Sequence, residues 1–231
     1  MSLSNENYKF WNQYRKKDQH SVIAGPISWE DAVRMAPEQR RWLETPIIRE
    51  YLESINRPAV AEIGCGLGRL LKVFAKDYYV AGFDISARMI KGATQYLKDD
   101  ILKVICLNQV FYGESGTKIL PLDKFPEKFH FIFAFLVFQH LQTAKEIENY
   151  IDHMALMLKP GGYIRIQTHI GEPHPEDKFG GFHGHFFPSL EELVKVFHRN
   201  TKLGVMESEQ GVGHPDWLWV TAKKAMEIAV C

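Results

Sequence analysis

Three glycines at alternate positions mark the part of this 231-residue chain best suited to hold a ligand. The apolar run 60–63 leads into Gly64, Gly66 and Gly68, and apolar residues then recur with helical spacing. A strand, a glycine turn and a helix bring a ligand against bare backbone in α/β proteins. Glu62 stands just before the turn, where it would repel a phosphate and attract a cationic amino group. The segment therefore predicts a site for a ligand that carries an amino group.

A second carboxylate follows the next predicted strand. The apolar run 78–83 ends at Asp84, about twenty residues after the first glycine. That spacing suits a carboxylate that accepts hydrogen bonds from both hydroxyls of a ribose. Because Ser86 opens a helical pattern, capping of that helix is the alternative role for Asp84.

A third motif, the sequence Leu-Lys-Pro-Gly-Gly at 158–162, lies between a helical pattern and an alternating strand pattern. A nicotinamide dinucleotide site is disfavoured, since its third glycine would fall at Arg69 and Glu62 precedes the turn. Taken in order, the three motifs resemble those of the class I S-adenosylmethionine-dependent methyltransferases, over roughly residues 58–223. Such enzymes carry an acidic D/E-x-G-x-G-x-G turn, an acid after the second strand and an L-K-P-G-G corner.

The resemblance implies a fold that the chain's own patterns support. Strands and helices alternate through its centre, which indicates an α/β protein with a parallel sheet between helices. The family fold is Rossmann-like, with a seven-stranded, mostly parallel sheet, helices on both faces and an antiparallel last strand, here at 217–221. We expect residues 1–57 to form an N-terminal helical extension or cap and residues 58–231 to form the cofactor-binding domain.

The resemblance also implies S-adenosyl-L-methionine as the cofactor and S-adenosylhomocysteine as the product. The turn would receive the methionyl part, with Glu62 near its ammonium group; holding the amides of the turn is the alternative role for Glu62. The residues expected at the cofactor in this region are Glu62, Gly64, Cys65, Gly66, Gly68, Asp84, Ile85 and Met89. Cys65 would contribute backbone, while Ile85 and Met89 would enclose the adenine, although Met89 also fits a core position.

The third strand has two candidate positions. The run 101–107 would place Asn108 at the strand end, and the run 110–112 would place Glu114 and Ser115 there. We favour the second, because the first leaves a long structureless loop before the strand that begins near residue 129. In the family this position meets the adenine, so Glu114 and Ser115 are predicted cofactor contacts.

The segment after the buried strand 129–135 is expected to reach the reacting atoms. Carboxyl ends of parallel strands face the ligand crevice, and Val-Phe-Gln-His-Leu resembles a segment that many small-molecule methyltransferases carry there. Phe135, Leu136 and Gln139 are predicted at the cofactor, and Gln139 and His140 face the reacting centre. His140 has a pKa range suited to a general base; a buried structural histidine is the alternative. Many relatives have aspartate at His130, which weakens any role carried over to that position.

A histidine-rich segment, 169–188, follows the next predicted strand at the same edge of the sheet. Its aromatics and glycines suggest a mobile lid in which His183 and His185 contact the substrate; an ordinary surface loop is the alternative. The spacing of His183 and His185 does not match a helical ligand pair, so we expect no metal site.

Composition narrows the function classes further. Lys plus Arg and Asp plus Glu both number 28, and a net charge of zero argues against binding to nucleic acid by bulk electrostatics. The three cysteines have no disulfide or metal spacing, the start of the chain is polar, and no apolar run could span a bilayer. These features favour a cytoplasmic protein that is not embedded in a membrane.

The sequence as a whole predicts a methyltransferase that acts on a small molecule. No N-P-P-Y type segment follows the fourth strand, which disfavours nucleobase or glutamine acceptors. The alternatives are a protein methyltransferase, a non-catalytic protein that binds S-adenosylmethionine or S-adenosylhomocysteine, and a metal-dependent catechol-type enzyme.

Overall fold

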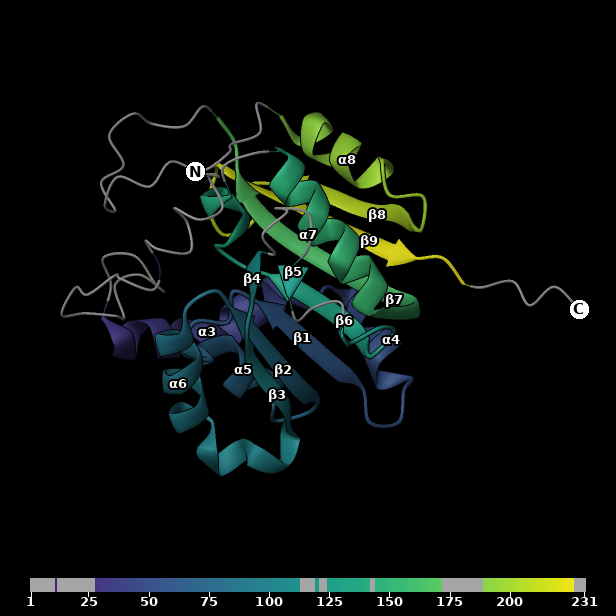
Figure 1. Ribbon diagram of the computed structural model, residues 1–231. Coiled ribbons are helices and arrows are strands. Elements are labelled where there is room, and N and C mark those ends of the chain that lie inside the picture. Colours follow the sequence, from purple (N-terminus) through teal and green to yellow (C-terminus); the bar gives the residue numbers. More distant parts are fainter. Residues whose placement is uncertain are drawn as a thin grey trace, which may run out of the picture.

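The computed structural model describes residue 11 and residues 28–112, 119–120, 124–141, 144–171 and 189–226 (Figure 1). Seven strands form one sheet in the order β3-β2-β1-β6-β7-β9-β8. In that order they are β3 (Val104–Gln109), β2 (Tyr79–Asp84), β1 (Ala59–Ile63), β6 (Phe129–Ala134), β7 (Leu158–His169), β9 (Trp217–Lys224) and β8 (Leu203–Gln210).

The sheet is parallel from β3 to β7, and β9 runs antiparallel to both of its neighbours, β7 and β8. Strand β6 lies in the middle of the sheet and is buried on both faces. Phe131 and Phe133 pack into one hydrophobic cluster, while Ile132 and Ala134 pack into the other. This arrangement confirms the expected Rossmann-like sheet and its antiparallel last strand.

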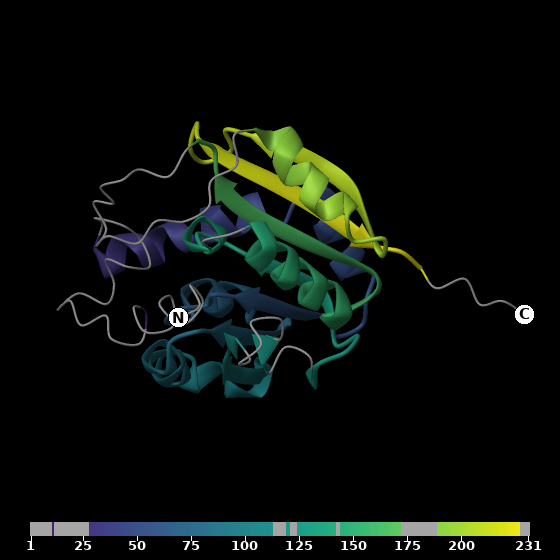
Figure 2. The same ribbon diagram turned by 45° about the horizontal axis from the view of Figure 1, so that its top comes forward.

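Helices cover both faces of the sheet. Side chains of α7 (Ala144–Met157) and α8 (Leu190–His198) fill the core on one face. Side chains of α3 (Trp29–Leu43), α4 (Pro46–Glu53) and α5 (Arg69–Phe74) fill the core on the other, as the two views show (Figures 1 and 2). Helix α6 (Ala87–Tyr96) packs against β2 and β3. The 3-10 turns η1 (Lys98–Lys103) and η3 (Phe138–His140) and a two-stranded sheet of β4 (Phe111–Tyr112) and β5 (Ile119–Leu120) complete the described elements.

The third strand is not where we expected it. Strand β3 covers residues 104–109 and pairs with β2, so that Asp84 lies opposite Gln109. Residues 111–112 instead pair with 119–120 outside the main sheet. The preference for 110–112 was therefore wrong, because the connection to β6 contains a small sheet of its own. Glu114 and Ser115 lie outside the described residues.

Helix α3 of the N-terminal extension is hydrogen-bonded to the sheet domain at two places. Arg40 of α3 donates to the Val73 carbonyl at 3.0 Å and to Asp77 at 2.6 Å, and it also pairs with Glu44. Arg165 of β7, only 1% exposed, donates to the Trp42 carbonyl at 2.7 Å at the end of α3. These contacts stabilise α3 against the sheet; the division of the chain at residue 57 stays a prediction. No helix in the described part of the chain is both long enough and apolar enough to cross a bilayer.

His130 lies at the start of β6, at the opposite end of that strand from Phe135. Its Nδ1 accepts a hydrogen bond of 3.0 Å from the Ala59 amide, at the first residue of β1. Burial, reinforced by Lys159, lowers the pKa of His130. His130, which stands where many relatives have aspartate, therefore has a structural role: it joins β6 to β1.

We expect His130→Phe to destabilise the protein by about 1–3 kcal/mol at about pH 7.5, because the Ala59 amide loses its partner. A histidine whose pKa is lowered in the folded state stabilises fully above its unfolded pKa, and this contribution is lost as the pH falls below about 6.5. The cost of the substitution, measured by urea unfolding, should shrink between about pH 7.5 and pH 5. An equal cost at both pH values would contradict the assignment.

Candidate functional site

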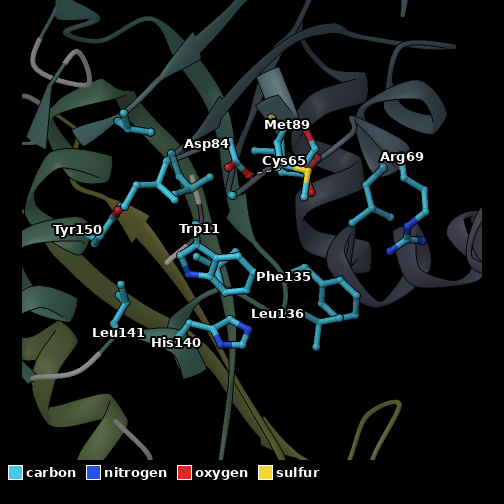
Figure 3. Close-up of a pocket in the computed structure, with 18 residues that line it drawn as sticks. Trp11, Cys65, Arg69, Asp84, Met89, Phe135, Leu136, His140, Leu141 and Tyr150 are labelled. Carbon is cyan, nitrogen blue, oxygen red and sulfur yellow. Dashed lines mark hydrogen bonds between the residues drawn. The ribbon is translucent and has the colours of Figure 1, made fainter. Parts of the chain in front are cut away.

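A pocket opens at the carboxyl ends of β1, β2 and β6, and its empty space is about 920 Å³ including the mouth. Eighteen residues line it (Figure 3): Trp11, Glu62, Ile63, Gly64, Cys65, Gly66, Arg69, Leu70, Asp84, Ile85, Met89, Val110, Phe135, Leu136, Val137, His140, Leu141 and Tyr150. The pocket lies where open α/β sheets bind ligands.

The glycine turn is tied to the end of β2. The amides of Gly64 and Cys65 both donate to the Phe83 carbonyl, at 2.7 and 3.0 Å. Gly64 has φ +73°, and a Cβ there would lie 2.2 Å from Cγ2 of Val137, in the loop after β6. Glycine is required because the backbone is left-handed and approaches that loop closely.

Asp84 connects the glycine turn to the start of α6. Its Oδ2 accepts from the Gly66 amide and its Oδ1 accepts from the Ser86 amide, both at 2.8 Å. Burial raises the pKa of Asp84 to about 6, although these two hydrogen bonds favour the charged form. The carboxylate lines the pocket and each oxygen has lone pairs to spare, so these two hydrogen bonds and the predicted ribose contact are compatible.

Glu62 and Arg69 bring two buried charges of opposite sign to the pocket, each 3% exposed. Burial raises the pKa of Glu62 and lowers that of Arg69, while the charge of each favours the charged form of the other. Oε2 of Glu62 and Nε of Arg69 have no hydrogen-bond partner. A buried polar atom without a partner in a pocket wall is a natural contact point for a ligand.

The loop after β6 forms the opposite wall of the pocket. Leu136 has φ +58°, which is unusual for a residue with a side chain. Its amide donates to Oε1 of Gln167 at 2.9 Å, and Gln167 is itself fully buried in β7. Such backbone strain is often found at binding sites, and here it directs the turn that carries Phe135 and Leu136 into the pocket wall.

The lining of one end of the pocket contains neither the two acids, Glu62 and Asp84, nor the glycine turn. Trp11 and His140 meet edge to face, with ring centroids 5.1 Å apart, and Leu141 and Tyr150 lie beside them (Figure 3). Leu141 and Tyr150 are 4% and 5% exposed. This end is mainly apolar and carries an imidazole, a phenol and an indole.

The structure brings most of the predicted site residues together. Ten of them line the pocket: Glu62, Gly64, Cys65, Gly66, Asp84, Ile85, Met89, Phe135, Leu136 and His140. Gly68 and Gln139 do not. A Cβ at Gly68 would meet Leu97 and Ala93, so this glycine allows close packing against α6. Oε1 of Gln139 is buried without a partner, and it is the neighbouring His140 whose side chain reaches the pocket.

Other predicted contacts lie outside the described residues, namely Glu114, Ser115, His183, His185 and the stretch 172–188 of the candidate lid. Among the residues that are described, no group of three or more histidine, cysteine or acidic side chains is arranged to hold a metal ion.

Sequence reasoning missed eight lining residues: Trp11, Ile63, Arg69, Leu70, Val110, Val137, Leu141 and Tyr150. Val110 follows directly on the end of β3, which extends two residues beyond the run 101–107 considered from the sequence. Arg69 follows the last glycine of the turn, but only its effect on the glycine spacing was considered. Trp11 and Tyr150 carry no local signal, because their place in the site depends on the packing of distant segments.

Comparison with known proteins identifies the class. Residues 61–164 match a family model described as a methyltransferase domain. Over 172 residues the chain is 23% identical to the tRNA (carboxymethyluridine(34)-5-O)-methyltransferase of Arabidopsis thaliana, covering 74% of this chain and 37% of that protein. The chain thus spans little more than a third of that relative's length.

Solved structures share the fold. A geranyl diphosphate C-methyltransferase of Streptomyces coelicolor A3(2), with S-adenosyl-L-homocysteine bound, has a TM-score of 0.64 at 11% identity, covering 97% of this chain and 99% of the other. A SAM-dependent methyltransferase of Methanosarcina mazei has a TM-score of 0.57 at 22% identity, covering 79% of this chain and 99% of the other.

Residues 61–164 thus form a methyltransferase domain, and the fold around it is that of the class I S-adenosylmethionine-dependent enzymes. Its cofactor is S-adenosyl-L-methionine, and S-adenosylhomocysteine is the product. The residues fit that cofactor, because the unpartnered oxygen of Glu62 and the bare backbone at Gly64 face the same pocket. Asp84 lies at the adjacent strand end, where a ribose would be held.

Proposed function

We propose that this protein transfers the methyl group to a small organic molecule bound at the Trp11–His140 end of the pocket. The supporting observation is that several lining residues remain after Glu62, Asp84 and the glycine turn have been assigned to the cofactor. Trp11, the adjacent pair His140 and Leu141, and Tyr150 come from three separate segments and lie together at one end of the pocket (Figure 3).

The chain's own groups would orient the acceptor and keep water away. The cofactor supplies a methyl group that the positive sulfur has already activated. Apolar side chains at this end exclude water, and the glycine turn and Asp84 hold the cofactor so that an acceptor atom can approach the methyl group in line. His140 would take the proton that the acceptor gives up, as predicted from the sequence.

A screen with labelled S-adenosylmethionine and a panel of small oxygen, nitrogen and carbon acceptors tests the proposal. With an acceptor identified, His140→Ala should lower kcat by about 10²–10⁴-fold if this imidazole is the base. Binding of S-adenosylhomocysteine, measured by calorimetry, should stay close to wild type. Tyr150→Phe tests the phenol at the same end of the pocket, because it keeps the ring and removes only the hydroxyl. If kcat is unchanged in both His140→Ala and Tyr150→Phe, this end of the pocket takes no part in the reaction.

A nucleoside in tRNA is a second candidate acceptor, since the Arabidopsis thaliana relative modifies a tRNA uridine. The equal numbers of acidic and basic residues favour the small molecule. The screen should therefore include total tRNA. Label in the RNA fraction alone would overturn the small-molecule proposal, label in protein would indicate a protein methyltransferase, and cofactor binding without transfer would indicate a non-catalytic binder.

The remaining expectations belong to this proposal. Glu114 and Ser115 would meet the adenine, and His183 and His185 would contact the acceptor from the lid. A cytoplasmic location agrees with Cys65 and Cys106, which are both free thiols.

A further inference from the structure

The edge of the sheet opposite the pocket carries basic side chains at most of its strands. All strands but β9 begin at this edge, and the antiparallel β9 ends there, beside the start of β7 (Figure 1). Six basic residues lie within two residues of these strand ends, in sheet order Lys103 (β3), Arg57 (β1), Lys128 (β6), Lys159 (β7), Lys223 (β9) and Lys202 (β8). The remaining strand, β2, begins with Tyr79, and its ring centroid lies 5.0 Å from the Arg57 guanidinium and 5.1 Å from Nζ of Lys103. We call these six residues the basic edge.

The basic edge has no acidic partners in the part of the chain that the structure describes. None of its six side chains forms an ion pair there, and the nearby acids are already paired: Glu127 with Lys224 at 2.9 Å and Asp100 with Lys72 at 3.3 Å. Because the chain as a whole has equal numbers of acidic and basic residues, this row is a local excess of positive charge. Neighbouring strands are about 4.8 Å apart, so the row is roughly 30 Å long.

Exposed apolar side chains lie beside the same edge. The described residues include six large apolar side chains that are exposed, and four of them are found here. Ile101 and Leu102, 59% and 89% exposed, stand in η1 just before β3, and Leu156 stands at the end of α7. Met226, 68% exposed, follows β9, and a Cβ at Gly161 would lie 2.7 Å from its Sδ. Exposed apolar groups gathered in one region indicate an interaction surface.

We infer that the basic edge binds the surface of an anionic lipid membrane, with Leu102 and Met226 entering the boundary between head groups and acyl chains. A lipid surface meets both features at once, because its head groups attract lysine and arginine and its acyl chains accept aliphatic side chains. RNA would satisfy the cations but would leave the aliphatic side chains in water. The pocket opens at the opposite strand ends, so it would face away from the membrane and stay open to an acceptor from the water.

Vesicle flotation tests the inference on the full chain. The protein should bind vesicles of phosphatidylcholine that contain roughly one-third phosphatidylserine and should not bind vesicles of phosphatidylcholine alone. Binding should be lost in about 1 M salt, where charges are screened within a few ångströms. Combining Lys128→Gln, Lys159→Gln and Lys202→Gln should weaken binding about 100-fold, since each cation at such a surface contributes roughly a factor of five.

Leu102→Ser tests the apolar part of the contact. It should weaken binding to the phosphatidylserine vesicles about tenfold, because a buried leucine is lost from the interface. The binding that remains should keep the wild-type dependence on salt. Unchanged binding in this variant would contradict insertion of the aliphatic side chains and would overturn the choice of a membrane as the partner.

A matched control removes the same charge elsewhere. Arg34→Gln, Lys91→Gln and Lys195→Gln together take three cations from α3, α6 and α8, which lie on the faces of the sheet. This variant should bind the vesicles as the wild type does, and equal weakening would show that net charge alone is responsible. All variants should bind S-adenosylhomocysteine with wild-type affinity, which checks that they are folded.

The wild-type protein also tests the choice of partner. No binding to the phosphatidylserine vesicles would overturn the inference, whatever the variants do. So would binding to RNA, measured by fluorescence anisotropy, that the three lysine substitutions abolish while vesicle binding persists. The inference concerns a surface apart from the pocket. A failed acceptor screen would leave it standing, and its own failure would leave the proposed methyl transfer standing.

Discussion

Gly64→Ala should destabilise the protein by about 2–5 kcal/mol and greatly weaken cofactor binding. A left-handed backbone at φ +73° costs an alanine about 1–2 kcal/mol of stability. Its Cβ would also lie 2.2 Å from Val137. Displacing a packed side chain adds about 1–3 kcal/mol. Because Val137 and Gly64 both line the pocket, the displacement changes the shape of the site itself. Urea unfolding and calorimetry with S-adenosylhomocysteine measure the two effects.

Gly211→Ala separates the backbone cost from the steric cost. Gly211 has φ +89°, and a Cβ there would meet nothing within 4 Å. This variant should lose only about 1–2 kcal/mol of stability and should bind the cofactor normally. Adding Val137→Ala to Gly64→Ala should recover part of the lost stability. If Gly64→Ala costs no more than Gly211→Ala, the close approach to Val137 is not a constraint.

Asp84→Ala should weaken S-adenosylhomocysteine by about 1–3 kcal/mol, or about 5- to 160-fold, the range for hydrogen bonds to a charged group. Calorimetry with the 2′-deoxyribose analogue isolates the contact with the sugar. The wild-type protein should bind that analogue more weakly than the parent, whereas Asp84→Ala should bind the two about equally. A variant that still discriminates between them would show that Asp84 serves only the Gly66 and Ser86 amides.

The pH dependence of binding gives an independent check on the same carboxylate. Burial raises the pKa of Asp84 to about 6. Hydrogen bonds from a ribose favour the charged form, so the pKa of Asp84 in the complex must be lower than in the free protein. Affinity should therefore be full well above pH 6 and should fall as the pH drops through that value. Asp84→Ala should lack this loss.

The central site could be predicted because its signals are local. Glu62 and the glycines stand next to one another in the chain, and Asp84 follows the next strand. Parallel strands must end at the same edge of a sheet, so two consecutive strand ends bring these groups together whatever the rest of the fold does. The buried strand 129–134 was equally recognisable from its continuous apolar run.

The predictions of the third strand and of Gly68 were wrong because two stretches of sequence had the same local pattern in each case. Residues 101–107 and 110–112 both read as strands, and loop length favoured the wrong one because the small β4–β5 sheet in the connection has no distinctive pattern. Gly68 has the same residue type and spacing as Gly64, yet a Cβ at Gly68 would face α6 and one at Gly64 would face the loop after β6. Nothing within the turn distinguishes these two neighbourhoods.

The sequence by itself determined that strands and helices alternate around a mostly parallel sheet, and its acids and glycines at short, characteristic spacing carried the resemblance that predicted the class of protein and the cofactor. Only the tertiary structure decided that Trp11 meets His140 and that Arg69 is anchored on α3 with Nε left unpartnered in the pocket wall. Burial and side-chain direction depend on contacts between segments far apart in the chain, and residue type and local spacing do not specify those contacts.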